Sequence, residues 1–362
     1  MGEALIDKLY ASYRAATSQS GTSSVYLNIG GHVAHLTFAG EALAAAILPS
    51  FNHACMEHQN DVVPSLTIYL WDASRVPCFI NDAFKQELYQ RLNHARQKID
   101  HITTIHLQFN DQGNILSVID VSKRIAFYFT SDVEQLPDYE ISAPMRTIIH
   151  WFCRMNQLLF VHGAGIGYQG MGILLVGRGG AGKSTTALLS LLNGFEFIGD
   201  DYIAISVRDT IKGYPVYRSA KLTDASLSKL PELKPYQLKM NHENVYGQQH
   251  QEKNIVRLDD NIGKLVSSLS LHMMMRPMVA QAKQTSFQSI SPMQLLADFA
   301  GSTILQMPGC GADMLRELTN ICRKLPSYSM RLSQDFNEIA ETLKQFIQRT
   351  HSEREVLVRC RI

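Results

Sequence analysis

The sequence has few of the features that mark secreted, zinc-scaffold or membrane-spanning proteins. Its 6 cysteines are scattered and form no CxxC pair, which argues against a disulfide framework and a zinc ribbon. It contains no run of about 18 apolar residues, so we expect no transmembrane helix. The first residues, MGEALIDKLY, lack the pattern of a signal peptide. We therefore expect a cytoplasmic protein with reduced thiols.

The sequence also lacks an excess of charge of either sign. Lys and Arg number 34 and Asp and Glu number 33, which gives a formal net charge of +1. This balance removes any whole-chain electrostatic reason to bind nucleic acid or an anionic membrane, and neither is an expected partner. Hydrophobic residues make up 45% of the chain, enough for a sizeable buried core. At roughly 150 residues per domain, 362 residues predict two domains.

Residues 1–135 form the first predicted domain, which we expect to be smaller and of mixed α and β structure. Strands are indicated by alternating apolar residues, and helices by apolar residues at helical spacing. No catalytic motif occurs in this region. Its expected elements are helices at 5–17, 40–55 and 82–99, and strands within 24–38, 65–71 and 103–109.

Residues 143–350 form the second predicted domain, and a helix across 143–160 leads into it. Strands and helices alternate along this region, which is typical of the α/β class. Its expected elements, beyond the motif described next, are strands at 214–218, 254–258 and 327–332, and helices at 292–299, 312–324 and 335–349.

The strongest motif is GRGGAGKS at 177–184, which matches G-x-x-x-x-G-K-[ST] in full. An apolar run, GILLV at 172–176, precedes it as a buried strand should, and STTALLSLLN at 184–193 continues as a helix. Glycines let the loop turn tightly and aim its N–H groups at an anion. The sequence therefore predicts a site for ATP with Mg²⁺. The residues expected to bind the nucleotide are Gly177, Gly179, Gly180, Ala181, Gly182, Lys183, Ser184 and Thr185.

Within this site the residues have different expected roles. Lys183 would reach the β- and γ-phosphates, and the Ser184 hydroxyl would be a ligand of Mg²⁺. Two acids, Asp200 and Asp201, end an apolar run about one helix after the loop. A parallel neighbouring strand would bring them to the γ-phosphate, where one carboxylate holds the metal and the other accepts a proton from an attacking hydroxyl. We assign the metal to Asp201 and both acids to catalysis. Because adjacent strand residues point to opposite faces, both can face the site only if the strand breaks there.

His162 lies shortly before the loop, in FVHGAGIGYQGMGILLVG. A hairpin over GIGYQGMG would place it beside the strand that precedes the loop. Spacing alone gives this histidine a structural role more readily than a catalytic one.

Taken together, these motifs resemble the catalytic domain of HPr kinase/phosphorylase. The order His162-Gly163, P-loop and Asp200-Asp201 is that of the family. The segment 143–206 is most similar to HPr-kinase-like proteins found beside genes for ribosomally made peptides. The similarity extends over about 143–346, through APMR, HWF, VHGAG, LLVGRGGAGKSTTAL, FIGDDY, YRSAKL, EKNIVRL, STILQMPGCG and LPSYSMRLSQD.

The resemblance implies an α/β P-loop catalytic domain of the HPr-kinase type, with the smaller α+β domain before it. It implies transfer of the γ-phosphate of ATP to a serine-type hydroxyl, and it makes His162 a catalytic candidate beside the two acids. Lys221, Lys253 and Arg178 are further candidates for contacts with phosphate or substrate.

The resemblance leaves the acceptor open between a peptide or protein serine and free serine or another small molecule. The bifunctional enzyme's downstream signature is missing here, as is its N-terminal domain. HPr kinases form oligomers, so a homo-oligomer is one expectation. The first domain would recognise the acceptor or have a structural role. Two other classes remain as alternatives, a P-loop ATPase and a non-catalytic nucleotide-binding regulatory protein. The sequence has no LSGGQ-like segment and no NKxD, which argues against ABC ATPases and GTPases.

Overall fold

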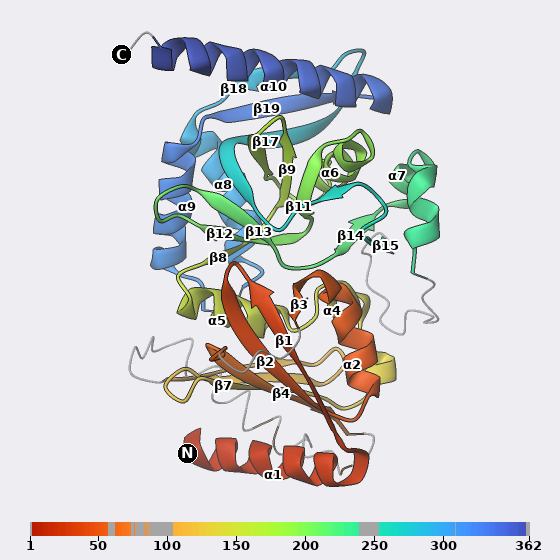
Figure 1. Ribbon diagram of the computed structural model, residues 1–362, viewed down its shortest axis with the longest axis vertical. Helices are drawn as coiled ribbons and strands as arrows, with labels where there is room; N and C mark the ends of the chain where they lie inside the picture. Colours follow the sequence, from red (N-terminus) through yellow and green to blue (C-terminus); the bar gives the residue numbers. More distant parts are fainter. Residues whose placement is uncertain are drawn as a thin grey trace. The chain divides into compact units, whose positions relative to one another are not determined.

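The computed structural model describes residues 2–56, 62–73, 76, 84, 86, 104–238, 253–307 and 309–359 (Figure 1). The chain divides into two units, Met1–Gln157 and Leu158–Ile362. Both contain sheets covered by helices, which confirms the expected mixed α/β class. No described helix is long and apolar enough to cross a membrane.

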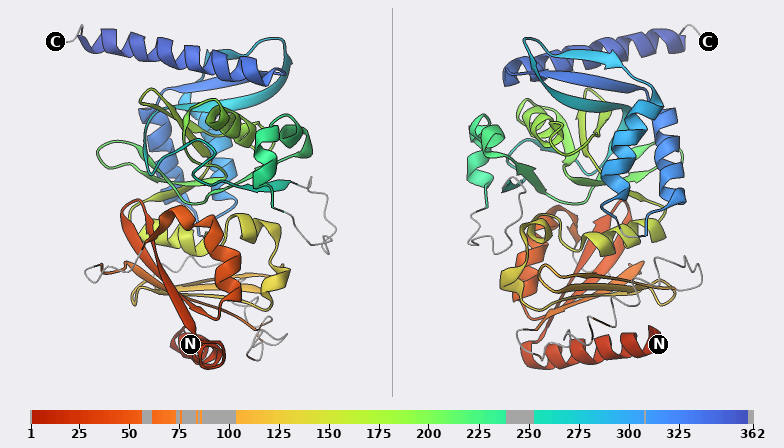
Figure 2. Two further views of the ribbon diagram at one scale, coloured as in Figure 1. Left: turned by 45° about the vertical axis from the view of Figure 1, so that its right-hand side comes forward. Right: turned by 180° about the vertical axis from the view of Figure 1, so that it is seen from behind.

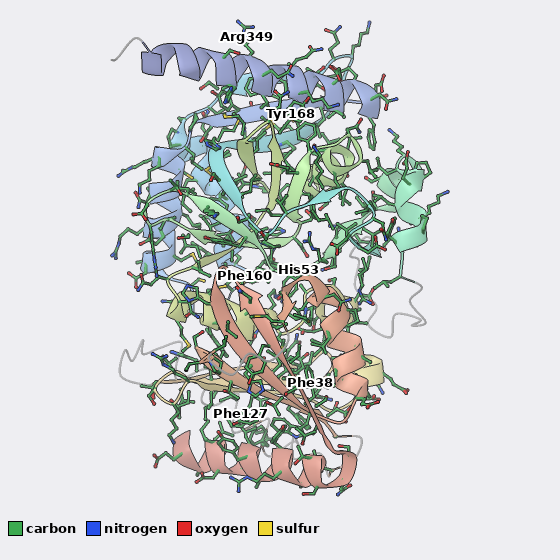
Figure 3. The ribbon with its side chains drawn as sticks, in the orientation of Figure 1. Phe38, His53, Phe127, Phe160, Tyr168 and Arg349 are labelled. Carbon is green, nitrogen blue, oxygen red and sulfur yellow. The ribbon has the colours of Figure 1, made fainter. Side chains whose placement is uncertain are left out.

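The first unit is built on a mixed sheet whose described strands run in the order β3-β1-β2-β4-β7-β6-β5. One face of this sheet is covered by helix α1, which packs Leu9 and Tyr13 among Trp71 and Phe127. Figure 3 labels Phe127 within this aromatic layer. The elements of the unit are α1 (Gly2–Ser20), β1 (Thr22–Ile29), β2 (His32–Ala39), α2 (Ala42–Ile47), the 3₁₀ turns η1 (Leu48–Ser50) and η2 (Asn52–Ala54), β3 (Cys55–Met56), β4 (Leu66–Asp72), β5 (Ile105–Asn110), β6 (Ile115–Asp120), β7 (Ile125–Thr130), η3 (Val133–Gln135), α4 (Asp138–Ser142) and α5 (Arg146–Met155).

The second unit is built on a larger mixed sheet in the order β16-β11-β9-β10-β17-β13-β12-β8, with β19 beside β17 and β18 beside β19. Its elements are β8 (Leu159–His162), β9 (Ala164–Tyr168), β10 (Met171–Leu175), α6 (Lys183–Leu192), β11 (Glu196–Gly199), β12 (Tyr202–Ser206), β13 (Lys212–Pro215), β14 (Ser219–Leu222), α7 (Asp224–Ser228), η4 (Pro231–Tyr236), β15 (Asn254–Arg257), β16 (Lys264–Leu265), β17 (Leu269–Ala282), β18 (Ser286–Ser289), α8 (Pro292–Ile304), α9 (Ala312–Lys324), β19 (Ser327–Ser333) and α10 (Phe336–Arg359).

Alternating residues of β10 serve the two faces of this larger sheet. Ile173 and Leu175 pack in a core with α6 and α10, whereas Leu174 packs in a second core with α8 and α9. Figure 2 shows α8 and α9 side by side, as two neighbouring helices. A strand buried on both faces has a continuous apolar sequence, which is why GILLV contains no polar residue. The sheet therefore holds the loop after β10 on a rigid base.

Several sequence-based expectations need adjustment. The helix expected at 40–55 is shorter, because Pro49 opens a 3₁₀ turn after Ile47 and the chain continues in such turns. The 14-residue strand β17 (LSLHMMMRPMVAQA) is absent from the expected strands, since its central residues Met273, Met274 and Met275 are all apolar and buried and show no alternation. The helix expected at 82–99 lies outside the described residues. The two units divide after Gln157, so α5 packs with the first unit rather than leading the second.

Candidate active site

The loop between β10 and α6 has the backbone of a phosphate cradle. Gly177, Gly180 and Gly182 have φ angles of 145°, 79° and 100°, in the region that favours glycine. A Cβ at Gly182 would also lie 2.7 Å from Leu332 Cδ1. Gly182 begins helix α6 without a side-chain cap, so the first N–H groups of the helix are available to an anion. The glycine pattern thus encodes an anion site at a helix N-terminus.

Lys183, the first residue of α6, folds back over this loop. Its Nζ donates hydrogen bonds to the carbonyl oxygens of Gly177 (2.7 Å) and Arg178 (3.2 Å), and the residue is buried. Burial lowers the pKa of Lys183, while the carboxylates of Asp200 and Asp201 act in the opposite direction. Both acids are therefore close enough to the loop lysine to act on its charge.

Asp200 is buried and its carboxylate has unmet hydrogen-bonding capacity. The residue is 1% exposed, and neither carboxylate oxygen has a hydrogen-bond partner in the described part of the chain. Burial, followed by the charge of Asp201, raises the pKa of Asp200. The Ser184 hydroxyl, the backbone N–H of Asp201 and the charge of Lys183 oppose this shift, although neither the hydroxyl nor the N–H meets hydrogen-bond geometry. A buried carboxylate of this kind is a candidate ligand for a cation.

Asp201 occupies the break between strands β11 and β12, with a left-handed φ of 66°. This conformation ends the strand alternation and turns its side chain to the same site as Asp200, as the sequence required. His162 Nε2 lies 3.1 Å from Oδ1, and Lys221 Nζ lies 3.2 Å from Oδ2. Burial works to raise its pKa, but Lys221 and His162 hold the pKa of Asp201 well below its usual range. Asp201 is therefore an ionised, firmly positioned carboxylate.

His162 ends β8, and the antiparallel hairpin of β9 and β10 follows it in the chain as expected. Strand β8 pairs with β12, where His162 lies opposite Tyr202, rather than with the hairpin. The backbone N–H of His162 donates to Thr303 Oγ1 at 3.3 Å. Its Nδ1 faces Gln306 Nε2 at 3.4 Å, and Gln306 also accepts a hydrogen bond from the Tyr202 hydroxyl. Gln306 and Tyr202 are positioning residues that sequence reasoning missed.

The strand arrangement differs in one respect from the expected one. Strand β9 is antiparallel to both β10 and β11, so β11 runs parallel to β10 but is separated from it by β9. Their carboxyl ends still lie at the same sheet edge, where α/β proteins bind ligands. The two acids therefore reach the loop across one intervening strand rather than from its direct neighbour.

The remaining predicted residues divide between the site and its edge. Lys221 contacts Asp201, and Lys253 acts on the charge of Lys183. The Thr185 hydroxyl lies 2.9 Å from Ser226 Oγ, which links α6 to α7. In the loop, Gly179 and Gly180 are exposed and Ala181 is partly exposed. Arg178 points elsewhere, with Nε 2.7 Å from Oδ1 of Asp298 on α8.

A glycine-rich loop, a buried lysine, an acid pair and a histidine lie at one sheet edge, an arrangement that resembles the P-loop sites of α/β proteins. Comparison with known proteins adds the following findings. No family model matches the chain. It is 35% identical over 77 residues to the HPr kinase/phosphorylase of Malacoplasma penetrans (strain HF-2), which is 21% of this chain and 26% of that protein.

The match thus spans about a quarter of that curated relative. Among solved structures, the chain is similar to the HPr(Ser) kinase/phosphatase from Coxiella burnetii, with a TM-score of 0.29 and 10% identity, over 54% of this chain and 98% of that one. The curated match supports an HPr kinase-like family for this chain, as its motifs predicted.

Proposed function

We propose that the protein is an ATP-dependent kinase that transfers the γ-phosphate to a serine-type hydroxyl of a peptide or protein. The observation that supports this most is that the loop lysine Lys183 lies near two carboxylates, Asp200 and Asp201, whose surroundings differ. Lys183 experiences both charges. Within the described residues the carboxylate oxygens of Asp200 have no hydrogen-bond partner, whereas Asp201 has two partners. A site that only bound and released nucleotide would not need this second, preorganised acid. Similarity to an HPr kinase/phosphorylase supports a kinase-type enzyme.

The phosphate chain would lie on the loop N–H groups and the start of α6. Lys183 would move from the Gly177 and Arg178 carbonyls to the β- and γ-phosphate oxygens. Its charge would offset the negative charge that the transferring phosphoryl group carries. Positioning and electrostatics supply most of the rate in such reactions, so a fixed lysine and a fixed acid suffice.

Magnesium fits the donors on the P-loop side of the site. Mg²⁺ prefers oxygen ligands and is held by one or two carboxylates together with substrate phosphates. The partnerless oxygens of Asp200, with the Ser184 hydroxyl acting on them, supply such a set. We therefore give the metal to Ser184 and Asp200, which replaces the sequence-based choice of Asp201. The metal would neutralise charge on the phosphates.

Asp201 would then serve the acceptor. Its side chain is 24% exposed, whereas Asp200 is almost fully buried, so Asp201 is the acid that an incoming hydroxyl can reach. It would accept a hydrogen bond from that hydroxyl and take its proton as the new oxygen–phosphorus bond forms and the bond to ADP breaks. Lys221 and His162 would hold the carboxylate in place, and Gln306 would orient His162.

Mass spectrometry of an acceptor panel tests this proposal. Purified protein receives ATP, Mg²⁺ and free serine, HPr or serine-containing peptides, and each acceptor is examined for added phosphate. Lys183→Ala should lower transfer by orders of magnitude, whereas Lys324→Ala at the exposed end of α9 serves as the matched lysine control. Phosphate on a peptide or protein supports the proposal. Phosphate on free serine alone would make it a small-molecule kinase, and ATP consumption with no modified acceptor would favour an ATPase.

A further inference from the structure

Beyond the aspartate pair, a two-stranded ribbon of β14 and β15 continues the site. Its antiparallel register pairs Lys221 with Ile255 and Ser219 with Arg257. Residues that face each other in a pair, and every second residue along a strand, share one face. Lys221 and Arg257 therefore lie on the same face, two positions apart. The opposite face carries Ala220, Leu222, Val256 and Leu258, which pack in the core with α6.

The positive groups of this ribbon follow the path of phosphoryl transfer. Lys253, just before β15, acts on the charge of the loop lysine Lys183 and so lies at the nucleotide end. Lys221 contacts Asp201, the acid beside which the phosphoryl group would be transferred to the acceptor. Arg257 lies two residue pairs past the Lys221–Ile255 pair, on the side away from Lys253, roughly 6–7 Å further at the rise of a strand. We take this side of Lys221 to be the side from which the acceptor approaches.

Arg257 has a donor that the described part of the chain does not use. Its Nε is buried without a hydrogen-bond partner there, and burial lowers the pKa of its guanidinium. Arg218, the residue before β14, is 6% exposed and also has no partner for Nε and Nη1. Asp260 is the acid whose charge acts on Arg218. Unmet guanidinium donors in such a position disfavour the empty site and favour a bound oxyanion.

We propose that Arg257 recognises an oxyanion on the acceptor, a carboxylate within about two residues of the phosphorylated serine. The inference rests on the proposed kinase function and deepens it, since it makes the acceptor an acidic peptide. A planar guanidinium holds a carboxylate through two parallel hydrogen bonds, which fixes orientation as well as affinity. The anion's source is either an Asp or Glu side chain or a chain-terminal carboxylate. Both sources present the same group to Arg257.

The test uses serine peptides with randomised flanking positions, each supplied with a free or an amidated C-terminus. Wild-type protein, Arg257→Gln, Arg257→Lys and the exposed α9 control Arg316→Gln are compared for phosphate incorporation, ATP KM and thermal stability. The wild type should favour peptides with Asp, Glu or a free C-terminus near the serine. Amidation distinguishes the terminal carboxylate from the side chain. Arg257→Gln should slow acidic peptides roughly tenfold or more and leave their Gln counterparts and the ATP KM unchanged.

Arg257→Lys should recover only part of the acidic preference, because it keeps the charge and loses the planar fork. Three results would overturn the inference. The first is a wild type that is indifferent to acidic residues, and the second is an Arg257→Gln variant that keeps the preference. An increase in ATP KM with unchanged acceptor preference would assign the anion to the nucleotide. If ATP binds and no peptide is phosphorylated, the peptide-kinase proposal fails first, and the inference fails with it.

Discussion

Two carboxylates with almost the same burial, one in each unit, behave in opposite ways. Asp120 at the end of β6 is 2% exposed and Asp200 is 1% exposed. Asp120 accepts hydrogen bonds from the backbone and hydroxyl of Ser122 and from the backbone of Lys123. Although burial works to raise it, these bonds lower the pKa of Asp120, whereas burial and a neighbouring charge raise that of Asp200. A buried carboxylate with its hydrogen bonds made is typical of a structural acid. A buried carboxylate without them is typical of an acid that binds a ligand.

The largest effect is expected at Asp201, the acid that we propose contacts the acceptor. Asp201→Asn should reduce phosphate transfer by roughly a hundredfold or more, because the amide cannot accept the hydroxyl proton. ATP affinity should change little, since the loop and Lys183 are intact. The same substitution at Asp120 should leave transfer unchanged. Measurements of transfer rate and nucleotide binding for both variants test this difference between the two positions. An Asp120→Asn variant that transfers phosphate slowly at normal stability would contradict it.

The next effect concerns stability and has opposite signs in the two units. Asp200→Asn should raise the melting temperature and lower transfer, because it removes a buried charge that has no partner. Asp120→Asn should lower the melting temperature, because its amide cannot accept the same three hydrogen bonds. Thermal melts at neutral pH test both. A destabilised Asp200→Asn protein would mean that its carboxylate has a structural partner.

The same pair predicts opposite pH dependence of stability. The folded-state pKa of Asp120 is lowered, so its contribution is present above the unfolded-state pKa and disappears as the pH falls through the folded-state pKa. The folded-state pKa of Asp200 is raised, so its contribution is present below the unfolded-state pKa and is lost as the pH rises through the folded-state pKa. Melts of each Asn variant against wild type across the acidic range should therefore diverge in opposite directions.

The smallest effect is expected at Gln306, which does not touch the reacting groups. Gln306→Ala frees His162 and Tyr202 from their shared partner, and kcat should fall by about three- to tenfold with little change in KM. Gln306→Glu supplies an acceptor to His162 and should shift the pH profile of kcat. A fall in stability without any change in kcat or pH profile would give this residue a purely structural role.

The parts of the candidate site that lie close together in the sequence could be predicted from it. GRGGAGKS contains both the glycines that the loop needs and its lysine, and Asp200-Asp201 follow within one helix and one strand. Gln306 was hidden because it lies 144 positions from His162, and spacing along the chain cannot report such a contact. The partners of Lys221 and Arg178 were equally unreadable, since both look like free cations in the sequence. In the structure one pairs with Asp201 and the other with Asp298.

Helices and strands could be predicted where the spacing of apolar residues is regular, and not where a strand is buried on both faces. Strand β4 and helices α8 and α9 follow their apolar spacing. Met273, Met274 and Met275 of β17 are buried in the cores on the two faces of the sheet, so this part of the strand lacks the alternation on which a strand prediction depends. The order of strands is not local information either, so the placement of β9 between β10 and β11 required the structure.

The central claim is that the buried carboxylate of Asp200 binds the metal of a metal–nucleotide complex. Thermal melts with ADP test this claim most directly. Wild type and Asp200→Asn are melted with no ligand, with ADP alone and with ADP plus Mg²⁺. Asp200→Asn should be the more stable protein without ligand, and wild type should gain more from adding Mg²⁺ to ADP. An equal magnesium-dependent gain in the two proteins would contradict the assignment of Asp200 to the metal and the reasoning from unmet burial that led to it.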